Sequence, residues 1–180
     1  MNARLSLTGV MLAAGLSAAS AQTPVPSWMI VDAAHKTLAV DLMAGWNPEN
    51  GALNFNGHYQ GNMTLVVPQG WTVKVSFTNH DGMLPHSLLV TKVYPQDAIP
   101  IEAGQPEVAI SKAYTGDPIA GLAPNEKDGF LFVARDPGDY WLLCGVPGHG
   151  VQGMYVGLKI DPNAAAPEID VVSGSPAGRP

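Results

Sequence analysis

Short runs in which apolar and polar residues alternate recur along most of the chain, with the two-residue period of half-buried β-strands. Gly, Pro, Asn and Asp residues, which favour turns, separate many of the runs, as in Asp136-Pro137-Gly138. The runs cover residues 28–31, 37–43, 62–67, 72–78, 87–93, 107–110, 129–133, 139–144 and 154–160. Many short strands at this spacing predict an all-β protein, either a sandwich or a barrel.

The same pattern predicts little helix and a single domain. No stretch keeps a 3.6-residue apolar period over three turns, although residues 47–59 are ambiguous. We expect residues 28–162 to form one domain of common size. A linker at 22–27 precedes it, and a disordered tail at 163–180 follows it. Residues 94–122 are rich in Pro and Gly and predict a long excursion between strands.

The beginning of the chain predicts export. Residues 1–21 combine an early Arg4, an apolar stretch and the small-residue end Ala19-Ser20-Ala21, which is typical of a secretory signal peptide. The apolar stretch is shorter than the roughly 20 residues that a transmembrane helix requires. We therefore expect cleavage, a periplasmic or extracellular location and no stable membrane insertion afterwards. An uncleaved N-terminal anchor is the alternative.

The chain is acidic and sparsely charged. It has 15 Asp and Glu residues against 9 Lys and Arg, a formal net charge of -6, and only 13% charged residues. Nucleic-acid binding relies on clustered Lys and Arg, so we expect no nucleic-acid partner. No feature of the sequence predicts an oligomer, and we expect a monomer.

The single cysteine, Cys144, gives the strongest chemical signal. An odd cysteine in an exported protein indicates an intermolecular bridge, a free reactive thiol or a metal ligand. His149 and Met154 follow it at the spacing Cys-x4-His-x4-Met, with several glycines between them. A lone cysteine is usually a small buried hydrophobe, but three donor residues on one short loop are far less expected by chance. The spacing therefore favours a metal.

The donor types indicate which metal. Thiolate, thioether and imidazole together favour copper, and two His, one Cys and a weak axial Met make a blue-copper electron-transfer site. The candidates for the second histidine are His35, His58, His80 and His86. We favour His86, because it opens the predicted strand 87–93 directly after Pro85, which stiffens the backbone. Met83 is the alternative to Met154 as axial ligand, but we expect it on the rim of the site.

These residues carry a resemblance to a known family. The chain resembles the cupredoxins, and within them the sulfocyanin and rusticyanin group, over about residues 28–160. The matching motifs are Asn54-Phe55-Asn56-Gly57, the segment 63–71, Phe77-Thr78-Asn79, Leu84-Pro85-His86 and the loop from Cys144 to His149. The resemblance implies a Greek-key β-sandwich that holds one mononuclear type 1 copper ion. It implies His86, Cys144 and His149 as strong copper ligands and Met154 as the weak axial ligand.

One position departs from many cupredoxins, which have Asn immediately after the first histidine where this chain has Ser87. In the family this residue ties the first ligand strand to the cysteine loop. Groups that hydrogen-bond the ligands tune a metal site. We therefore expect Ser87 to join the two ligand segments but to leave fewer hydrogen bonds to the thiolate sulfur, which raises the reduction potential.

The predicted function is electron transfer by an exported blue copper protein between respiratory partners. The resemblance suggests a cytochrome or a terminal oxidase as the partner. We expect no enzymatic activity, because four protein ligands leave no open position for a substrate. The loop 144–154 has no charged side chain, and with Leu84 and Pro85 it predicts an apolar docking rim around His149. Copper delivery or storage is the alternative function, and a small oxidoreductase with its own substrate is a third.

Overall fold

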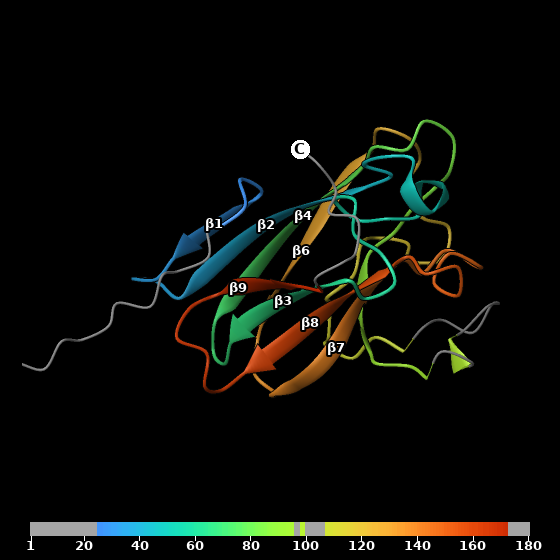
Figure 1. Ribbon diagram of the computed structural model, residues 1–180. Coiled ribbons are helices and arrows are strands. Elements are labelled where there is room, and N and C mark those ends of the chain that lie inside the picture. Colours follow the sequence, from blue (N-terminus) through green and yellow to red (C-terminus); the bar gives the residue numbers. More distant parts are fainter. Residues whose placement is uncertain (1–24, 96–97, 100–106, 173–180) are drawn as a thin grey trace, which may run out of the picture.

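Two β-sheets pack face to face in the computed structural model, which describes residues 25–95, 98–99 and 107–172 (Figure 1). One sheet has the strand order β1 (Met29–Asp32), β2 (Thr37–Ala44), β4 (Thr72–Asn79) and β6 (Lys127–Val133). The other has the order β5 (Leu89–Lys92), β7 (Gly138–Leu143), β8 (Tyr155–Asp161), β3 (Met63–Pro68) and β9 (Glu168–Val171). This arrangement confirms the predicted all-β sandwich. The expected signal peptide lies outside the described residues.

The chain crosses repeatedly from one sheet to the other. β2 pairs with β4 in parallel, and β3 pairs with β8 in parallel, whereas the other strand pairs are antiparallel. Parallel neighbours cannot be joined by a tight hairpin, and here β3 of the second sheet connects β2 to β4 of the first. These crossings tie both sheets together, so that the strand ends at one end of the sandwich form a stable frame for loops.

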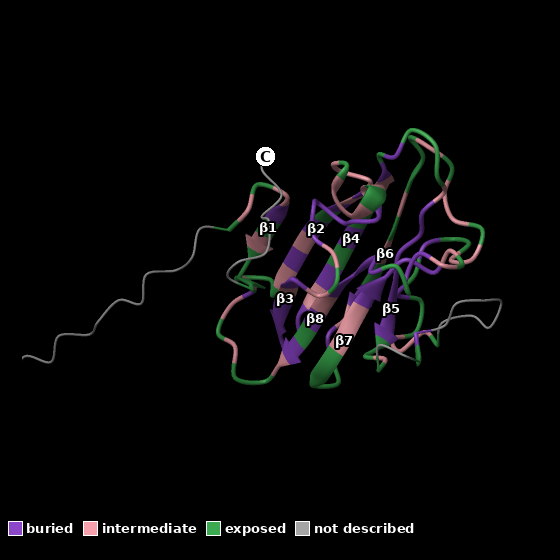
Figure 2. Ribbon diagram, turned by 45° about the vertical axis from the view of Figure 1, so that its right-hand side comes forward, coloured by how far each residue is buried: buried purple, intermediate pink, exposed green. Residues whose placement is uncertain are grey.

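The core lies between the sheets and follows from the alternating pattern. In β4 the side chains of Val73, Val75 and Phe77 are buried, whereas Lys74 and Ser76 between them are exposed. Figure 2 shows the resulting bands of buried and exposed residues along the strands. Each fully buried Val, Leu or Phe side chain contributes about 1.5–3 kcal/mol relative to exposure. The interior is therefore apolar and closely packed behind the loops.

The ambiguous segment 47–59 forms loops and one short 3-10 helix, η1 (Glu49–Ala52). The buried Asn54 holds it, because its amide donates hydrogen bonds to the carbonyl oxygens of Asn47 at 3.0 Å and Glu49 at 2.9 Å. Asn50 reaches across to the β7–β8 loop and donates to the carbonyl oxygen of Gln152 at 3.1 Å. The segment thus supports the loop that carries His149 and Met154.

Three expectations need correction. Of the predicted strand 87–93, only Leu89–Lys92 forms a strand, β5. The predicted strand 107–110 is wrong, because this segment forms only an isolated bridge with β5, between Val108 and Thr91. The tail 163–180, expected to be disordered, contains β9, which pairs antiparallel with β3. Ile169 lies opposite Leu65 and packs against the core, which explains why this exposed strand pairs with the edge of the sheet. The domain therefore continues beyond residue 162.

Among the described residues, no helix is long and apolar enough to cross a membrane.

Candidate metal centre

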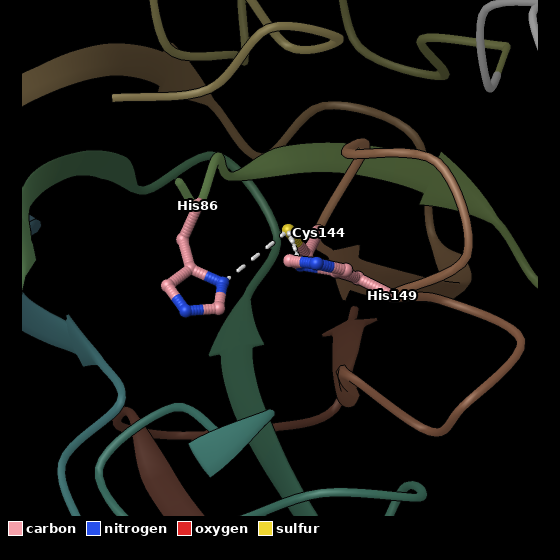
Figure 3. Close-up of side chains that lie close together, drawn as sticks. All are labelled: His86, Cys144 and His149. Atoms are coloured by element: carbon pink, nitrogen blue, oxygen red, sulfur yellow. Dashed lines mark hydrogen bonds between the residues drawn. The ribbon is translucent and has the colours of Figure 1, made fainter. Parts of the chain in front are cut away.

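The ends of two neighbouring strands bring the predicted donor residues together. His86 lies just before β5, Cys144 follows β7 directly, and His149 lies in the loop between β7 and β8. β5 and β7 pair with Leu89 opposite Leu143, so their ends at this side of the sheet are adjacent. The expectation that the strands next to His86 and Cys144 are neighbours is confirmed. Figure 3 shows how the side chains of His86, Cys144 and His149 come close together.

The donor atoms of these residues converge on one point. The Sγ atom of Cys144 lies 3.5 Å from Nδ1 of His149 and 4.0 Å from Nδ1 of His86. One potential ligand atom from each residue lies within 4.8 Å of the others. The residues are 0%, 1% and 8% exposed for His86, Cys144 and His149. One soft thiol and two imidazoles in a buried cluster fit a mononuclear copper ion.

Met154 closes the loop that carries Cys144 and His149. Its side chain is completely buried, its backbone N–H donates to the carbonyl oxygen of His149 at 3.0 Å, and its carbonyl oxygen accepts from the N–H of Cys144 at 3.0 Å. Met83 is 83% exposed, as expected for a residue on the rim. The axial role of Met154 remains a prediction.

The other histidines lie outside the cluster. His35 is exposed and pairs with Asp32, whose Oδ2 lies 2.7 Å from its Nδ1. His80 is exposed and its ring lies against Trp46, with 5.9 Å between the centroids. His58 is buried in the loop after η1, where burial lowers its pKa. The preference for His86 over these three is consistent with this arrangement.

Sequence reasoning missed Asp81, which contacts His86 from the side away from Cys144. Oδ2 of Asp81 lies 3.1 Å from Nε2 of His86, while Oδ1 accepts the backbone N–H groups of Met83 at 2.8 Å and Leu84 at 3.1 Å. Asp81 is only 8% exposed. The segment Asn79-His80-Asp81-Gly82 reads simply as a turn, and the only available signal was an acidic residue close before a candidate ligand.

Asn79 fixes the turn that carries Asp81. Its buried side-chain amide donates to the carbonyl oxygens of Leu84 at 2.9 Å and Leu122 at 2.8 Å, and its Oδ1 accepts the N–H of Asp81 at 3.0 Å. Gly45 packs against the same turn, since a Cβ atom there would lie 2.7 Å from Cβ of Asp81. The approach to His86 is thus held by side-chain hydrogen bonds and close packing.

Ser87 joins the two ligand segments, as expected. Its Oγ accepts the N–H of Gly145 at 2.9 Å and donates to the carbonyl oxygen of Pro118 at 2.7 Å. Its backbone N–H points to Sγ of Cys144 at 3.4 Å. Because the Ser87 hydroxyl donates its hydrogen bond to Pro118, the backbone N–H is the group of Ser87 that donates to the sulfur.

The described part of the excursion, residues 107–122, lies against one flank of the cluster. His86 and Leu122 exchange two backbone hydrogen bonds of 3.2 and 2.7 Å. Gly145 packs so closely on this segment that a Cβ atom at its position would overlap the carbonyl oxygen of Pro118. The glycine next to Cys144 therefore lets the excursion lie directly against the ligand loop.

The surroundings of the donors keep both imidazoles neutral near neutral pH. Burial lowers the pKa of His86, and the hydrogen bond and charge of Asp81 offset this only in part. Burial, followed by the effect of His86, lowers the pKa of His149 to about 4. Burial raises the pKa of the Cys144 thiol, although hydrogen bonds from Ser87 and Val146 oppose it. The rings therefore offer lone pairs, and the thiol releases its proton on binding a metal.

Burial works to raise the pKa of Asp81, but the hydrogen bonds from His86, Met83 and Leu84 together hold the pKa of this carboxyl below its ordinary value. The carboxylate is therefore the charged group in direct contact with the cluster.

Comparisons with known proteins agree with this geometry. The model of the Sulfocyanin (SoxE) domain matches residues 24–170. Sulfocyanin of Sulfolobus acidocaldarius is 30% identical over 139 residues, covering 74% of this chain and 68% of that protein. Rusticyanin of Acidithiobacillus ferrooxidans is 31% identical over 112 residues, covering 57% of this chain and 63% of that protein. The chain thus spans about two thirds of the length of these relatives.

Two solved structures share the fold. Auracyanin of Roseiflexus castenholzii has a TM-score of 0.50 at 21% identity, covering 69% of this chain and 97% of that chain. Auracyanin B has a TM-score of 0.50 at 23% identity, covering 69% and 88%. The two-sheet fold and the buried cysteine and histidine cluster define a cupredoxin, a class whose cofactor is one type 1 copper ion. Within this class, the chain belongs to the sulfocyanin family.

Proposed function

We propose that the protein is an exported electron carrier that holds one copper ion through His86, Cys144, His149 and Met154. The convergence of the first three donor residues within 4.8 Å carries this proposal. The family supports it, since relatives in this class are blue copper electron-transfer proteins. Copper bound there would supply one-electron exchange between its +1 and +2 states.

The residues around the donors serve a carrier rather than a substrate site. β5 and β7 fix the positions of His86 and Cys144, so the donors keep their places when the charge of the site changes. His86 and Cys144 are inaccessible to water, and His149 is only slightly exposed. Met154 would fill the position that a catalytic metal leaves open. These features favour electron transfer over catalysis.

The loop 144–154 and the residues just before His86 supply an apolar contact surface, which we call the docking rim. Its members include Met83, Leu84 and Val151, which are 83%, 38% and 40% exposed, and the loop has no charged side chain. Transient redox complexes use interfaces below about 1,200 Å². A redox partner such as a cytochrome or a terminal oxidase therefore docks here, in our proposal, for a short time and mainly through apolar contact.

The copper proposal is tested by adding Cu(II) to the mature protein and recording its visible absorption, with Cys144→Ser as the matched variant. The wild type should develop an intense band near the red end of the spectrum, and the variant should lose it completely because the band needs the thiolate. Buried donors should also release copper slowly to a chelator. A colourless wild-type protein that binds copper, or rapid loss to the chelator, would contradict electron transfer and favour delivery.

Export is part of the proposal and depends on residues 1–21. N-terminal sequencing of the protein from its native host should find Gln22 as the first residue, because the predicted cleavage site follows Ala21. A membrane-bound form that still begins at Met1 would instead indicate an N-terminal anchor.

A further inference from the structure

We propose that Asp81 positions the copper ligand His86 and that its negative charge favours Cu(II) over Cu(I), which lowers the reduction potential of the site. This inference rests on the proposed function, because it takes His86 as a copper ligand. It assigns a role in the metal site to a residue that binds no metal itself.

The first step is the choice of ring nitrogen. The carboxylate of Asp81 can only accept, so the contact of 3.1 Å requires Nε2 of His86 to carry the proton and donate it. A neutral imidazole has one protonated nitrogen, and Nδ1 therefore keeps its lone pair. Nδ1 is the nitrogen that lies 4.0 Å from Sγ of Cys144. Asp81 thus selects the tautomer and the ring orientation that a metal beside Cys144 requires.

The second step is that Asp81 is itself held in place. Its other oxygen, Oδ1, accepts the N–H groups of Met83 and Leu84, so rotation of the carboxylate would break two hydrogen bonds. The Oδ1 atom of Asn79 fixes the backbone of Asp81, and Gly45 packs against it. With Oδ1 occupied, Oδ2 remains directed at His86. A carboxylate fixed in this way can orient a ligand rather than follow it.

The third step concerns charge. A fixed negative charge stabilises the more positive state of a nearby ion, which is Cu(II). Asp81 is 8% exposed, and this limits screening by solvent. Apart from the Cys144 thiolate, the loop 144–154 on the other side of the cluster has no charged side chain. Removing the charge of Asp81 should therefore change the ratio of Cu(II) to Cu(I) affinity about tenfold, which is ~59 mV for one electron.

The experiment compares Asp81→Asn with wild type and with Asp117→Asn in redox titrations of the blue band. Asp117 is a matched control, because its Oδ1 also accepts two backbone N–H groups, those of Ile119 and Ala120, but it is exposed. Asp81→Asn should raise the reduction potential by ~59 mV, which corresponds to the tenfold change in affinity ratio. Asp117→Asn should leave the potential unchanged. Equal potentials for wild type and Asp81→Asn would overturn the role of the charge.

A second measurement tests the positioning role of Asp81 even where Asp81→Asn fails to fold or to bind copper. Nitrogen NMR of the histidine rings in the copper-free wild type should show His86 with its proton on Nε2. Asp81→Ala, if folded, should show a mixture of both tautomers. A wild-type ring protonated at Nδ1 would overturn the positioning role. A wild type that never turns blue would instead contradict the proposed function, whichever tautomer is found.

Discussion

The two segments that carry the proposed copper ligands are held in different ways. Residues 79–87 hold His86 by side-chain hydrogen bonds, chiefly those of Asn79 and Asp81. The loop 144–154 is held mainly by backbone hydrogen bonds between its own residues and by glycines packed against other segments, with Asn50 and Ser87 adding one side-chain hydrogen bond each. The loop therefore determines which metal can bind, because it carries the thiolate. The segment 79–87 is better suited to tune that metal, since its side chains other than His86 can change without loss of a proposed ligand.

The largest effect should come from a methyl group next to Cys144. In Gly145→Ala the new Cβ overlaps the carbonyl oxygen of Pro118, and the backbone must move, which should destabilise the protein by about 3 kcal/mol. Gly82→Ala in the other segment is the matched control, because nothing lies within 4 Å of its Cβ. Denaturant unfolding of the copper-free proteins measures both. Similar stabilities for the two variants would remove the distinction between the segments.

A somewhat smaller loss should follow removal of the amide that organises residues 79–87. Asn79→Ala leaves the carbonyl oxygens of Leu84 and Leu122 without this donor, and about 2 kcal/mol of stability should be lost. The exposed Asn163→Ala serves as the control in the same unfolding experiment. The blue band of Asn79→Ala should persist in weakened or shifted form, because every ligand remains. Complete loss of colour would show that this segment does more than tune the site.

Ser87→Asn should lower the reduction potential. A longer amide side chain can donate to Sγ of Cys144, which the Ser87 hydroxyl does not do while it donates to Pro118. One added hydrogen bond is worth about 1 kcal/mol. The expected shift in potential is therefore somewhat smaller than the ~59 mV that corresponds to a tenfold affinity ratio. Potentiometry checks the sign, with Ser87→Ala as the variant that removes the hydroxyl. An unchanged or higher potential in Ser87→Asn would contradict the expected tuning by this position.

The smallest effect should be kinetic. Val151→Asp places a charge on the docking rim and should slow electron exchange with a redox partner a few-fold, leaving the blue band unchanged, because rim charges act mainly on association. Ile30→Asp introduces the same charge at an exposed apolar position on β1. Stopped-flow mixing with a reduced cytochrome measures both rates. Equal rates for Val151→Asp and wild type would argue that partners dock elsewhere.

The local patterns predicted most of the fold and the core of the site. Alternation in β2, β4 and β8 is strong because each strand buries one face, and Cys144 and His149 are close in sequence. β9 was missed because only Ile169 packs inward between the exposed Glu168 and Asp170. Asp81 was missed because its role depends on a turn that folds its carboxylate back to the ring of His86. Such a contact is set by three-dimensional geometry and leaves little trace in spacing.

The burial of Cys144 also affects how the chain can be made. Cys144 is 1% exposed, so folding shields its thiol from oxidants and foreign thiols. In an oxidising compartment, a lone thiol is at risk of wrong pairing only while the chain is still unfolded. Disulfide-linked dimers should therefore mark molecules that were slow to fold, and the yield of active protein should depend on how quickly β7 and β8 close over this residue.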